Sequence, residues 1–365
     1  MDLTIAGQRL ANQGLSTRPF ANPAAAVRAL GAVQAQDYAG AKWGVGLRAP
    51  GATDAHVAQA YADGMLLRTH LLRPTWHFVH AADIHWLLAL TAPRVHALNA
   101  TYYRRLGLDE PVMARGVAAV TEALRGGRHG TREAMRAAFE EAGIPTDGPL
   151  RLSYLLMHLE LDGIMCSGAR QGNQHTYALL DERVPADQRL RPADPLAELA
   201  RRYFLTRGPA SAQDFAKWSG LTVTAARRGL ESVKEALAPQ GAAGRELWGP
   251  PTPLPDDPPP AYLLSIYDEY ISSYADRSAM VAAEDAALLQ SLGNALTGIV
   301  VLGGQVAGTW KRALGSAGVA VSAELFRPPG PAEQAALAGA MDQFAAFLEL
   351  PRLAADPGSA ESPPS

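Results

Sequence analysis

Two glutamines near the N-terminus, Gln34 and Gln36, are the first residues whose type and spacing suggest chemistry. On an α-helix two such residues point in nearly opposite directions, whereas on an extended segment they point to the same side. The pair follows an Ala-rich run at 23–31 and precedes a glycine-rich stretch, so we expect the helix to have ended by Gln34. The two carboxamides would then face one pocket, with Ala35 turned to the core.

A pair of carboxamides can orient a water molecule through the carbonyl oxygens and hold an oxygen or a heterocyclic edge through the amides. It can neither donate a proton as a carboxylic acid does nor supply a negative charge. The alternative interpretation is a surface helix end with two solvated glutamines.

The elements that must position this pair begin with three expected helices, at 3–13, 23–33 and 55–63. Two short strands follow, at 65–72 and 75–79, joined by a tight turn. Three helices followed by a β-ribbon is the order of a winged helix, a variant of the helix-turn-helix.

The same pattern returns twice along the chain. A capping residue, a short helix and a glycine turn recur at 131–143 and at 211–220, each followed by a longer helix. We interpret this as a degenerate repeat of about 75–80 residues, which favours tandem copies of one module. The predicted fold is α+β and mainly α, with winged-helix units at 1–106, 107–190 and 191–250, a β-rich element with a closing helix at 251–353, and a disordered tail at 354–365.

The C-terminal element contains a predicted strand that starts at Tyr262 and runs through Asp268 and Glu269. Neighbours on a strand point to opposite faces, so these two carboxylates do not easily serve one pocket. A hairpin with a Gly-Gly turn is expected at 297–314, and a closing helix at 331–348.

Composition bounds the function. With 365 residues and 48% apolar residues, the chain is long enough for two or three compact modules and is globular. It has no apolar run of the roughly 18–20 residues that a membrane span needs, and its first residues do not resemble a signal peptide. The one cysteine, Cys166, rules out an internal disulfide and a Cys-based zinc site. We expect a cytoplasmic protein.

The net charge of −3 gives no global argument for a nucleic-acid partner. The distribution of charge along the chain is more informative. Residues 60–235 hold 22 Lys/Arg and 19 Asp/Glu, and the rest of the chain holds 11 Lys/Arg and 17 Asp/Glu. This bias favours a polyanionic partner for the middle of the chain, and ordinary solvated faces are the alternative.

Four motifs follow one another along the chain: Gln34-Ala35-Gln36, the wing segment 72–79 with its Thr-x-His, the stretch 267–277 and the stretch 308–312. In this order they resemble the bacterial winged-helix DNA glycosylases of the AlkZ/YcaQ superfamily, and the resemblance covers about residues 3 to 350. The AlkZ-like branch of that superfamily carries a catalytic Gln-x-Gln and the YcaQ-like branch a Gln-x-Asp; this chain has the first form. The resemblance implies a monomeric enzyme with a C-shaped channel for double-stranded DNA, with catalytic Gln34 and Gln36 at the channel floor.

Cleavage of a glycosidic bond passes through an oxocarbenium-like state and usually needs one carboxylic acid and one carboxylate. A pair of glutamines is enough only where the leaving base is already activated, as an N7-alkylated purine is by its positive charge. The residue types therefore indicate a monofunctional glycosylase for cationic N7-alkylpurines in DNA, including bulky adducts and interstrand crosslinks. The resemblance also implies that the protein gives self-resistance to a DNA-alkylating natural product and is located at the nucleoid. A non-catalytic winged-helix regulator is the alternative.

Other candidate residues follow from the motifs. Asp37, next to the pair, either places negative charge near the developing cation or caps a local helix. Asp276 and Arg277 either support the site or form a buried structural link. We expect phosphate or site contacts from Arg68, Arg73, His77, Arg170, Lys311 and Arg312, and a supporting role for Asp37, Asp268, Glu269, Asp276 and Arg277.

A metal site is not expected. His70, His77, His80 and His85 are irregularly spaced and lack a motif such as His-Glu-x-x-His. No phosphate loop and no Gly-x-Gly-x-x-Gly opening a helix occurs in the chain, so we also expect no cofactor.

Overall fold

The computed structural model describes residues 3–241, 244–251, 261–293 and 296–354. The chain is mainly helical with four small sheets, which confirms the predicted fold class. Most of the Pro-rich stretch at 249–260 and of the predicted disordered tail lies outside the described residues. Within them, no helix is both long and apolar enough to cross a membrane.

The first unit is a helix, a short strand, two helices and a β-hairpin. Its three strands are antiparallel in the order β1-β3-β2, so the first strand adds to the hairpin as in a winged helix. The elements are α2 (Pro23–Leu30), β1 (Val33–Gln34), α3 (Tyr38–Arg48), α4 (Asp54–Ala62), β2 (Leu66–Leu71) and β3 (Thr75–His80).

Helix α3 corrects our prediction for this unit. We had counted α1 (Leu3–Asn12) as one of its three helices, but α1 packs against α10 (Pro195–Arg207) instead. The glycines that follow Tyr38 lie within α3. They are needed there because neighbouring elements approach the helix too closely for a larger side chain to fit. A Cβ atom at Gly46 would overlap the ring of Phe347, and one at Gly44 would meet the carboxylate of Asp268.

The second unit repeats the element order and topology of the first, with strand order β4-β6-β5. The 22-residue helix α5 (Ile84–Arg105) leads into it from the first unit. The other elements are α6 (Glu110–Leu124), β4 (Gly130–Thr131), α7 (Arg132–Glu141), α8 (Arg151–Leu161), β5 (Met165–Ser167), β6 (Thr176–Leu179) and α9 (Leu180–Arg183).

The third unit follows the same plan with a smaller sheet. After α10, an isolated bridge between Ala210 and Trp248 takes the place of the first strand. Helix α11 (Ala212–Ser219), helix α12 (Val223–Glu231) and the strands β7 (Ala238–Pro239) and β8 (Trp248–Gly249) complete it. These three repeats confirm the predicted tandem winged helices, while the domain boundaries stay a prediction.

The C-terminal element is a five-stranded sheet in the order β13-β12-β11-β10-β9. The predicted hairpin and closing helix are present, but the first strand ends at Ser265 and a short helix begins after Asp268, which caps it. The elements are β9 (Tyr262–Ser265), α13 (Glu269–Ser272), α14 (Ala283–Leu292), β10 (Gly298–Leu302), β11 (Gln305–Gly315), β12 (Gly318–Leu325), α15 (Pro331–Phe347) and β13 (Arg352–Leu353).

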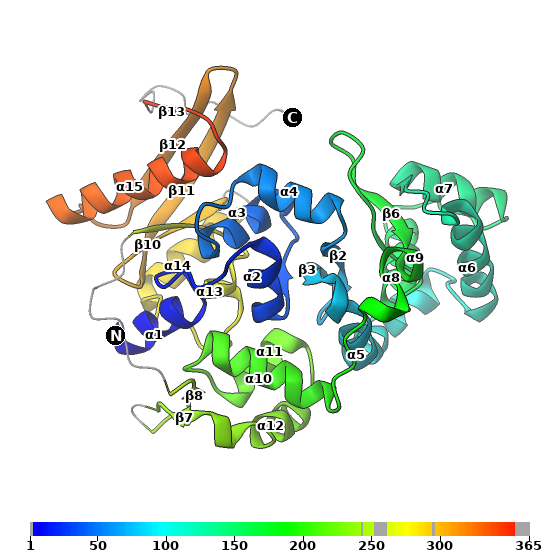
Figure 1. Cartoon of the computed structure of the whole chain (residues 1–365), viewed down its shortest axis with the longest axis horizontal. Coiled ribbons are helices and arrows are strands. Elements are labelled where there is room, and N and C mark those ends of the chain that lie inside the picture. Colours follow the sequence, from blue (N-terminus) through cyan, green and yellow to red (C-terminus); the bar gives the residue numbers. More distant parts are fainter. Residues whose placement is uncertain (1–2, 242–243, 252–260, 294–295, 355–365) are drawn as a thin grey trace.

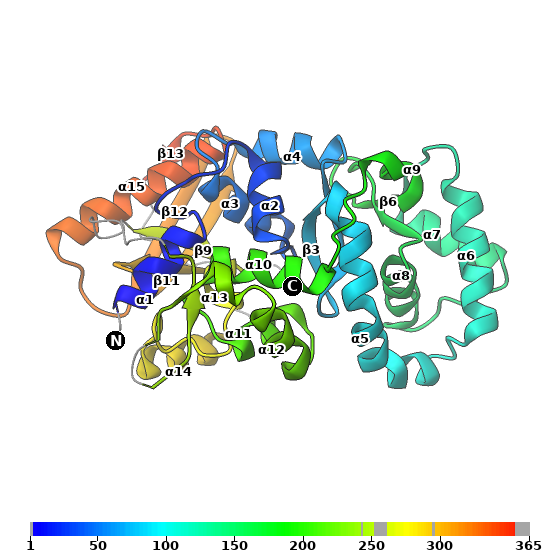
Figure 2. The same ribbon diagram turned by 60° about the horizontal axis from the view of Figure 1, so that its bottom comes forward.

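The units are arranged along the long axis of the molecule (Figure 1). The second unit, with α6 and α7, forms one end, and α15 with the C-terminal sheet forms the other. Figure 2 shows the same order, with the first unit between them and α10–α12 beside it. One continuous core joins the first unit, the third unit and the C-terminal sheet, whereas the second unit has a core of its own.

Candidate functional site

The backbone at Gln34 is extended, as predicted, and pairs with the hairpin of the first unit as part of β1, while Ala35 and Gln36 follow the end of this strand. Ala35 is fully buried. Its N–H donates to the carbonyl oxygen of Trp76 at 2.7 Å, and its carbonyl oxygen accepts from Nε of Arg68 at 2.9 Å. The segment leaves the sheet at this point and enters α3, so both glutamines lie at an element boundary held by the wing.

Gln34 is almost buried, with 8% of its surface exposed. Its Oε1 accepts a hydrogen bond from Nη2 of Arg73 at 3.0 Å, and its backbone N–H donates to Oε1 of Glu269 at 2.9 Å. Arg73 also donates to the carbonyl oxygens of Lys217 and Trp218 at the end of α11. The carboxamide of Gln34 is therefore oriented by Arg73 of its own unit, and Arg73 is in turn held by the third unit.

Glu269 is a buried carboxylate directly behind Gln34. Its Oε2 accepts from Nη2 of Arg207 at 2.7 Å, from Nε1 of Trp218 at 2.9 Å and from Oγ of Ser273 at 2.7 Å. Burial alone would raise its pKa, but the charge and hydrogen bonds of Arg207 outweigh burial and lower the pKa to about 2. Glu269 is thus ionised at neutral pH and fully engaged.

Asp268 does not share the pocket of Glu269. It lies beside α3 and accepts from Nη1 and Nη2 of Arg48 at 2.9 and 2.7 Å. Both partners of this pair are buried. The prediction that neighbouring carboxylates serve different surroundings holds, although the reason is the start of a short helix and not a strand.

Gln36, in contrast to Gln34, is exposed and lines a cavity of about 590 Å³. The cavity lies between the first and second units, because its walls come from both. The first unit contributes Gln36, Asp37, Tyr38, Arg68 and Trp76, and the second contributes Arg132, Glu133, Gln174, His175 and Tyr177.

Aromatic rings and cations alternate along this cavity. The guanidinium of Arg68 lies 4.3 Å from the ring centroid of Trp76, and that of Arg170, which does not itself line the cavity, lies 4.9 Å from the ring centroid of Tyr38. Burial, and then the charges of Arg68 and Arg170, lower the pKa of His175 to about 4, so this ring is neutral at pH 7. A flat apolar ligand with polar edges is the kind of molecule that such walls accept.

A second cavity, of about 390 Å³, lies on the other side of Asp37. Lys311 and Arg312 of β11 line it together with Trp43 and Thr297. Asp37 itself caps α3, since its Oδ1 accepts from the N–H of Ala39 at 3.1 Å. This confirms the local capping role that we gave as one alternative.

Three of the predicted residues do not join the site. His77 is fully buried and its Nδ1 lies 2.9 Å from the carbonyl oxygen of Thr75, so it offers no atom to DNA. Asp276 and Arg277 are exposed and form no buried link with each other; Asp276 pairs with Arg245 instead. Asp276 and Arg277 follow the short helix α13, which lies where the predicted strand was expected to continue.

The four histidines named above, at positions 70, 77, 80 and 85, do not come together around a possible metal site. His70 pairs with Glu160 of α8 and lies against Trp76, and His80 caps the turn that leads into α5. In the part of the chain that the structure describes, none of these histidines belongs to a group of three ligands.

Sequence reasoning missed the residues that complete the site. Arg207, which pairs with Glu269, is an ordinary helical arginine in sequence, and only its complete burial marks it. Trp76 lies inside the wing motif. An aromatic residue between polar neighbours could have indicated that its side chain belongs to the site. Tyr177 lies on β6, the second strand of the second wing, and His175 directly precedes it; their distance in sequence from Gln36 hid the connection.

Comparisons with known proteins identify the family and the fold. Residues 27–347 match the family described as "DNA glycosylase AlkZ-like". A curated Streptomyces sahachiroi protein named "Interstrand DNA cross-link repair glycosylase" is 25% identical over 328 residues, which is 83% of this chain and 85% of that protein. The solved structure of Streptomyces sahachiroi DNA glycosylase AlkZ is similar with a TM-score of 0.77 and 21% identity, covering 97% of this chain and 98% of that chain.

Proposed function

This chain belongs to the AlkZ-like family of DNA glycosylases, and we propose that it hydrolyses the N-glycosidic bond of N7-alkylated purines in double-stranded DNA. One observation carries the proposal: Gln36, an uncharged side chain, lies exposed at a cavity whose walls are aromatic rings and cations. Such a site suits a flat base, and it gives the reaction a carboxamide where other glycosidases use a carboxylate pair.

A carboxamide is sufficient for this reaction because the substrate base already carries a positive charge. Alkylation at N7 leaves the purine cationic, so the base departs with the electron pair of the C–N bond as a neutral molecule and needs no added proton. The sugar takes the positive charge, and a water molecule adds to C1′ and loses a proton to solvent. The products are the free alkylpurine and an abasic site.

We assign the positioning of that water to Gln36, whose carbonyl oxygen accepts a hydrogen bond from it. Gln34 is assigned the orientation of the sugar–phosphate backbone or of Gln36 itself, because Arg73 and Glu269 already hold it. No lysine lines the cavity in the described ranges, so a covalent imine with the sugar has no candidate nucleophile there and the enzyme is monofunctional.

Two carboxylates near Gln36 offer the rival mechanism, in which an acid protonates a neutral base. Asp37 is engaged in capping α3, and Glu133 accepts from Nε of Arg136 at 3.1 Å. The rival is testable because Asp37→Asn keeps the cap while removing the charge, and Glu133→Gln keeps the shape of that side chain.

The finer substrate class is a bulky or crosslinked adduct. A cavity of about 590 Å³ is in the size range that holds a drug-sized ligand, and it lies between two units and not within one. The relative from Streptomyces sahachiroi is named for interstrand cross-link repair. We propose that this enzyme unhooks such crosslinks as a monomer at the nucleoid and protects its host from a DNA-alkylating natural product.

The test is release of free base from duplexes that contain 7-methylguanine or an N7–N7 crosslink, under single-turnover conditions. We expect release by the wild type and a loss of about 10²-fold in rate for Gln36→Ala, the size of effect that removing one preorganised polar group has. Asp37→Asn and Glu133→Gln are the matched controls and should stay within a few-fold of the wild type.

No release by the wild type from any N7-alkylated duplex, with duplex binding intact, would instead favour a non-catalytic winged-helix regulator. A loss in the two carboxylate variants equal to the loss in Gln36→Ala would favour acid catalysis.

A further inference from the structure

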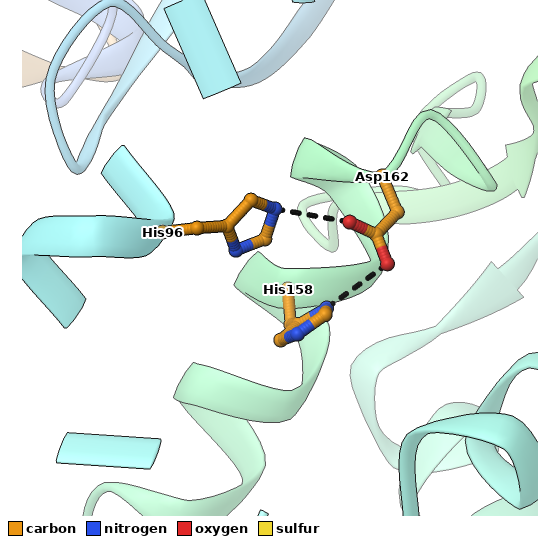
Figure 3. Close-up of side chains that lie close together, drawn as sticks. All are labelled: His96, His158 and Asp162. Atoms are coloured by element: carbon orange, nitrogen blue, oxygen red, sulfur yellow. Dashed lines mark ion pairs between the residues drawn. The ribbon is translucent and has the colours of Figure 1, made fainter. Parts of the chain in front are cut away.

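Three ligand-type side chains meet between α5 and α8, away from the cavity that holds Gln36. His96 comes from α5, and His158 and Asp162 come from the last turns of α8 (Figure 3). Nε2 of His96 lies 2.9 Å from Oδ1 of Asp162, and Nδ1 of His158 lies 3.1 Å from Oδ2. All three ligand atoms lie within 4.8 Å of one another.

We propose that His96, His158 and Asp162 form a Zn²⁺ site with three protein ligands and an open fourth position. Residues four apart on a helix lie on one face, so His158 and Asp162 present their ligand atoms together. Around a tetrahedral zinc with bonds of about 2.0–2.2 Å, neighbouring ligand atoms lie about 3.3 Å apart. In this structure the two imidazole nitrogens lie 2.9 and 3.1 Å from the two oxygens of Asp162, and the three ligand atoms lie within 4.8 Å of one another, so side-chain movements could bring all three around one ion.

The surroundings favour the metal-bound form of the histidines. Nε2 of His96 and Nδ1 of His158 are both buried, and each of them faces an oxygen of the Asp162 carboxylate. Nδ1 of His96 lies 3.1 Å from the hydroxyl of Tyr103. When this nitrogen donates to the hydroxyl oxygen, the lone pair of the ring is on Nε2, facing Asp162.

The donor set decides which ion the site prefers. Two imidazole nitrogens and one carboxylate suit Zn²⁺ and its first-row neighbours, whereas Mg²⁺ and Ca²⁺ prefer oxygen ligands alone.

The place of the cluster in the fold indicates what the ion would do. The second unit has its own core, and a small apolar cluster of Ala92, Val95, Met157 and Leu161 lies along the seam of α5 and α8. Each of the three ligands directly follows a member of this cluster in the sequence, namely Val95, Met157 and Leu161. A bound ion would fix the second unit against α5, and with it the wall of the cavity that carries Tyr177.

The experiment is equilibrium dialysis of the full chain against ZnCl₂ in the absence of DNA, followed by metal analysis. We expect one zinc per chain for the wild type, at least about a tenfold loss of affinity for His96→Ala and Asp162→Asn, and a comparable loss for Tyr103→Phe through the outer hydrogen bond. The matched control is His85→Ala, since His85 lies on the same helix and faces a single carboxylate, Asp181, at 4.0 Å.

Two further measurements make the result decisive. Zinc should raise the Tm of the wild type by several degrees and leave the Tm of His96→Ala unchanged, although both chains fold. Cobalt should give the visible absorption of a site with imidazole ligands in the wild type and in His85→Ala only. No retained zinc, or equal retention in all variants, would overturn the site. Base release by the metal-free wild type tests the glycosylase proposal separately.

Discussion

At the scale of single residues, the reactive and the structural groups are clearly divided. The charged side chains near the glutamine pair are occupied with each other, Glu269 with Arg207 and Asp268 with Arg48, and all four are buried. Removing one partner of such a pair leaves an unpaired buried charge, which typically costs about 3–5 kcal/mol. The Glu269–Arg207 pair therefore holds the backbone of Gln34 in place, and we propose that the exposed Gln36 meets the substrate.

His77 gives a pH prediction at the same scale. Burial, followed by the charge of Arg73, lowers its pKa to about 3. The unfolded chain binds a proton there below about pH 6.5 and the folded chain does not, so stability falls as the pH decreases from about 6.5 towards 3. At pH 5 this one group should cost about 2 kcal/mol of the free energy of unfolding.

The measurement is urea unfolding of the wild type and His77→Gln at pH 7.5 and pH 5. The wild type should lose more stability over this range than His77→Gln, whatever the variant costs at pH 7.5. An exposed histidine, His56, provides the control substitution. Equal pH dependence in wild type and His77→Gln would show that His77 takes up its proton while folded.

At the scale of elements, helix α3 positions the site because its glycines, which have no side chain, let neighbouring elements pack closely against it. Trp43 of this helix donates from Nε1 to the carbonyl oxygen of Leu263 at 2.6 Å, and its ring packs on Phe344 and Phe347 of α15. The close approach depends on the glycines on the same helix. As a result, the segment that begins at Gln34 is fixed to the C-terminal sheet as well as to the wing.

Gly46→Ala should therefore destabilise the protein, although alanine has the higher helix propensity. The added methyl group would overlap the ring of Phe347, and such overpacking typically costs about 1–3 kcal/mol. Gly339→Ala, in an exposed and open position on α15, is the matched control and should stabilise by up to about 1 kcal/mol. Urea unfolding compares the two, and a neutral or stabilising Gly46→Ala would contradict the packing argument.

Local pattern explains which elements were predictable. The extended backbone at Gln34, both wing hairpins and the recurring capped helices were predicted, because each depends on a short run of residues. Helix α3 and the turn into α13 were not, since long-range packing overrides the glycine signal in one and the cap of Asp268 ends the strand in the other. The same limit applies to the site: Gln36 was predicted, but its partners across the cavity, such as Tyr177, come from another unit.

At the scale of the whole molecule, the basic residues divide into two groups. Arg68 and Arg73 are held by the protein itself, through Ala35 and through Gln34 and α11. Lys311 is exposed and makes no side-chain hydrogen bond or ion pair within the described ranges, and it lines the smaller cavity beside Asp37. We expect Lys311 to contact a phosphate of the bound duplex.

Lys311→Ala should weaken binding to undamaged duplex and reduce the slope of log K against log salt concentration by about one, since one phosphate contact is lost. Lys234→Ala is the control, because Lys234 is engaged with Glu231 on the third unit. Fluorescence anisotropy at several salt concentrations measures both. An unchanged slope for Lys311→Ala would place the duplex elsewhere.

The account as a whole depends on the leaving base being charged before it reaches the enzyme, and one substrate pair tests this directly. We would measure single-turnover base release from a duplex with 7-methylguanine and from one with 7-deaza-7-methylguanine, which has the same shape but no positive charge. The account predicts release of the first base and rates lower by orders of magnitude for the second. Similar rates for the two would contradict it, because a pair of glutamines could not then be the whole of the catalytic apparatus.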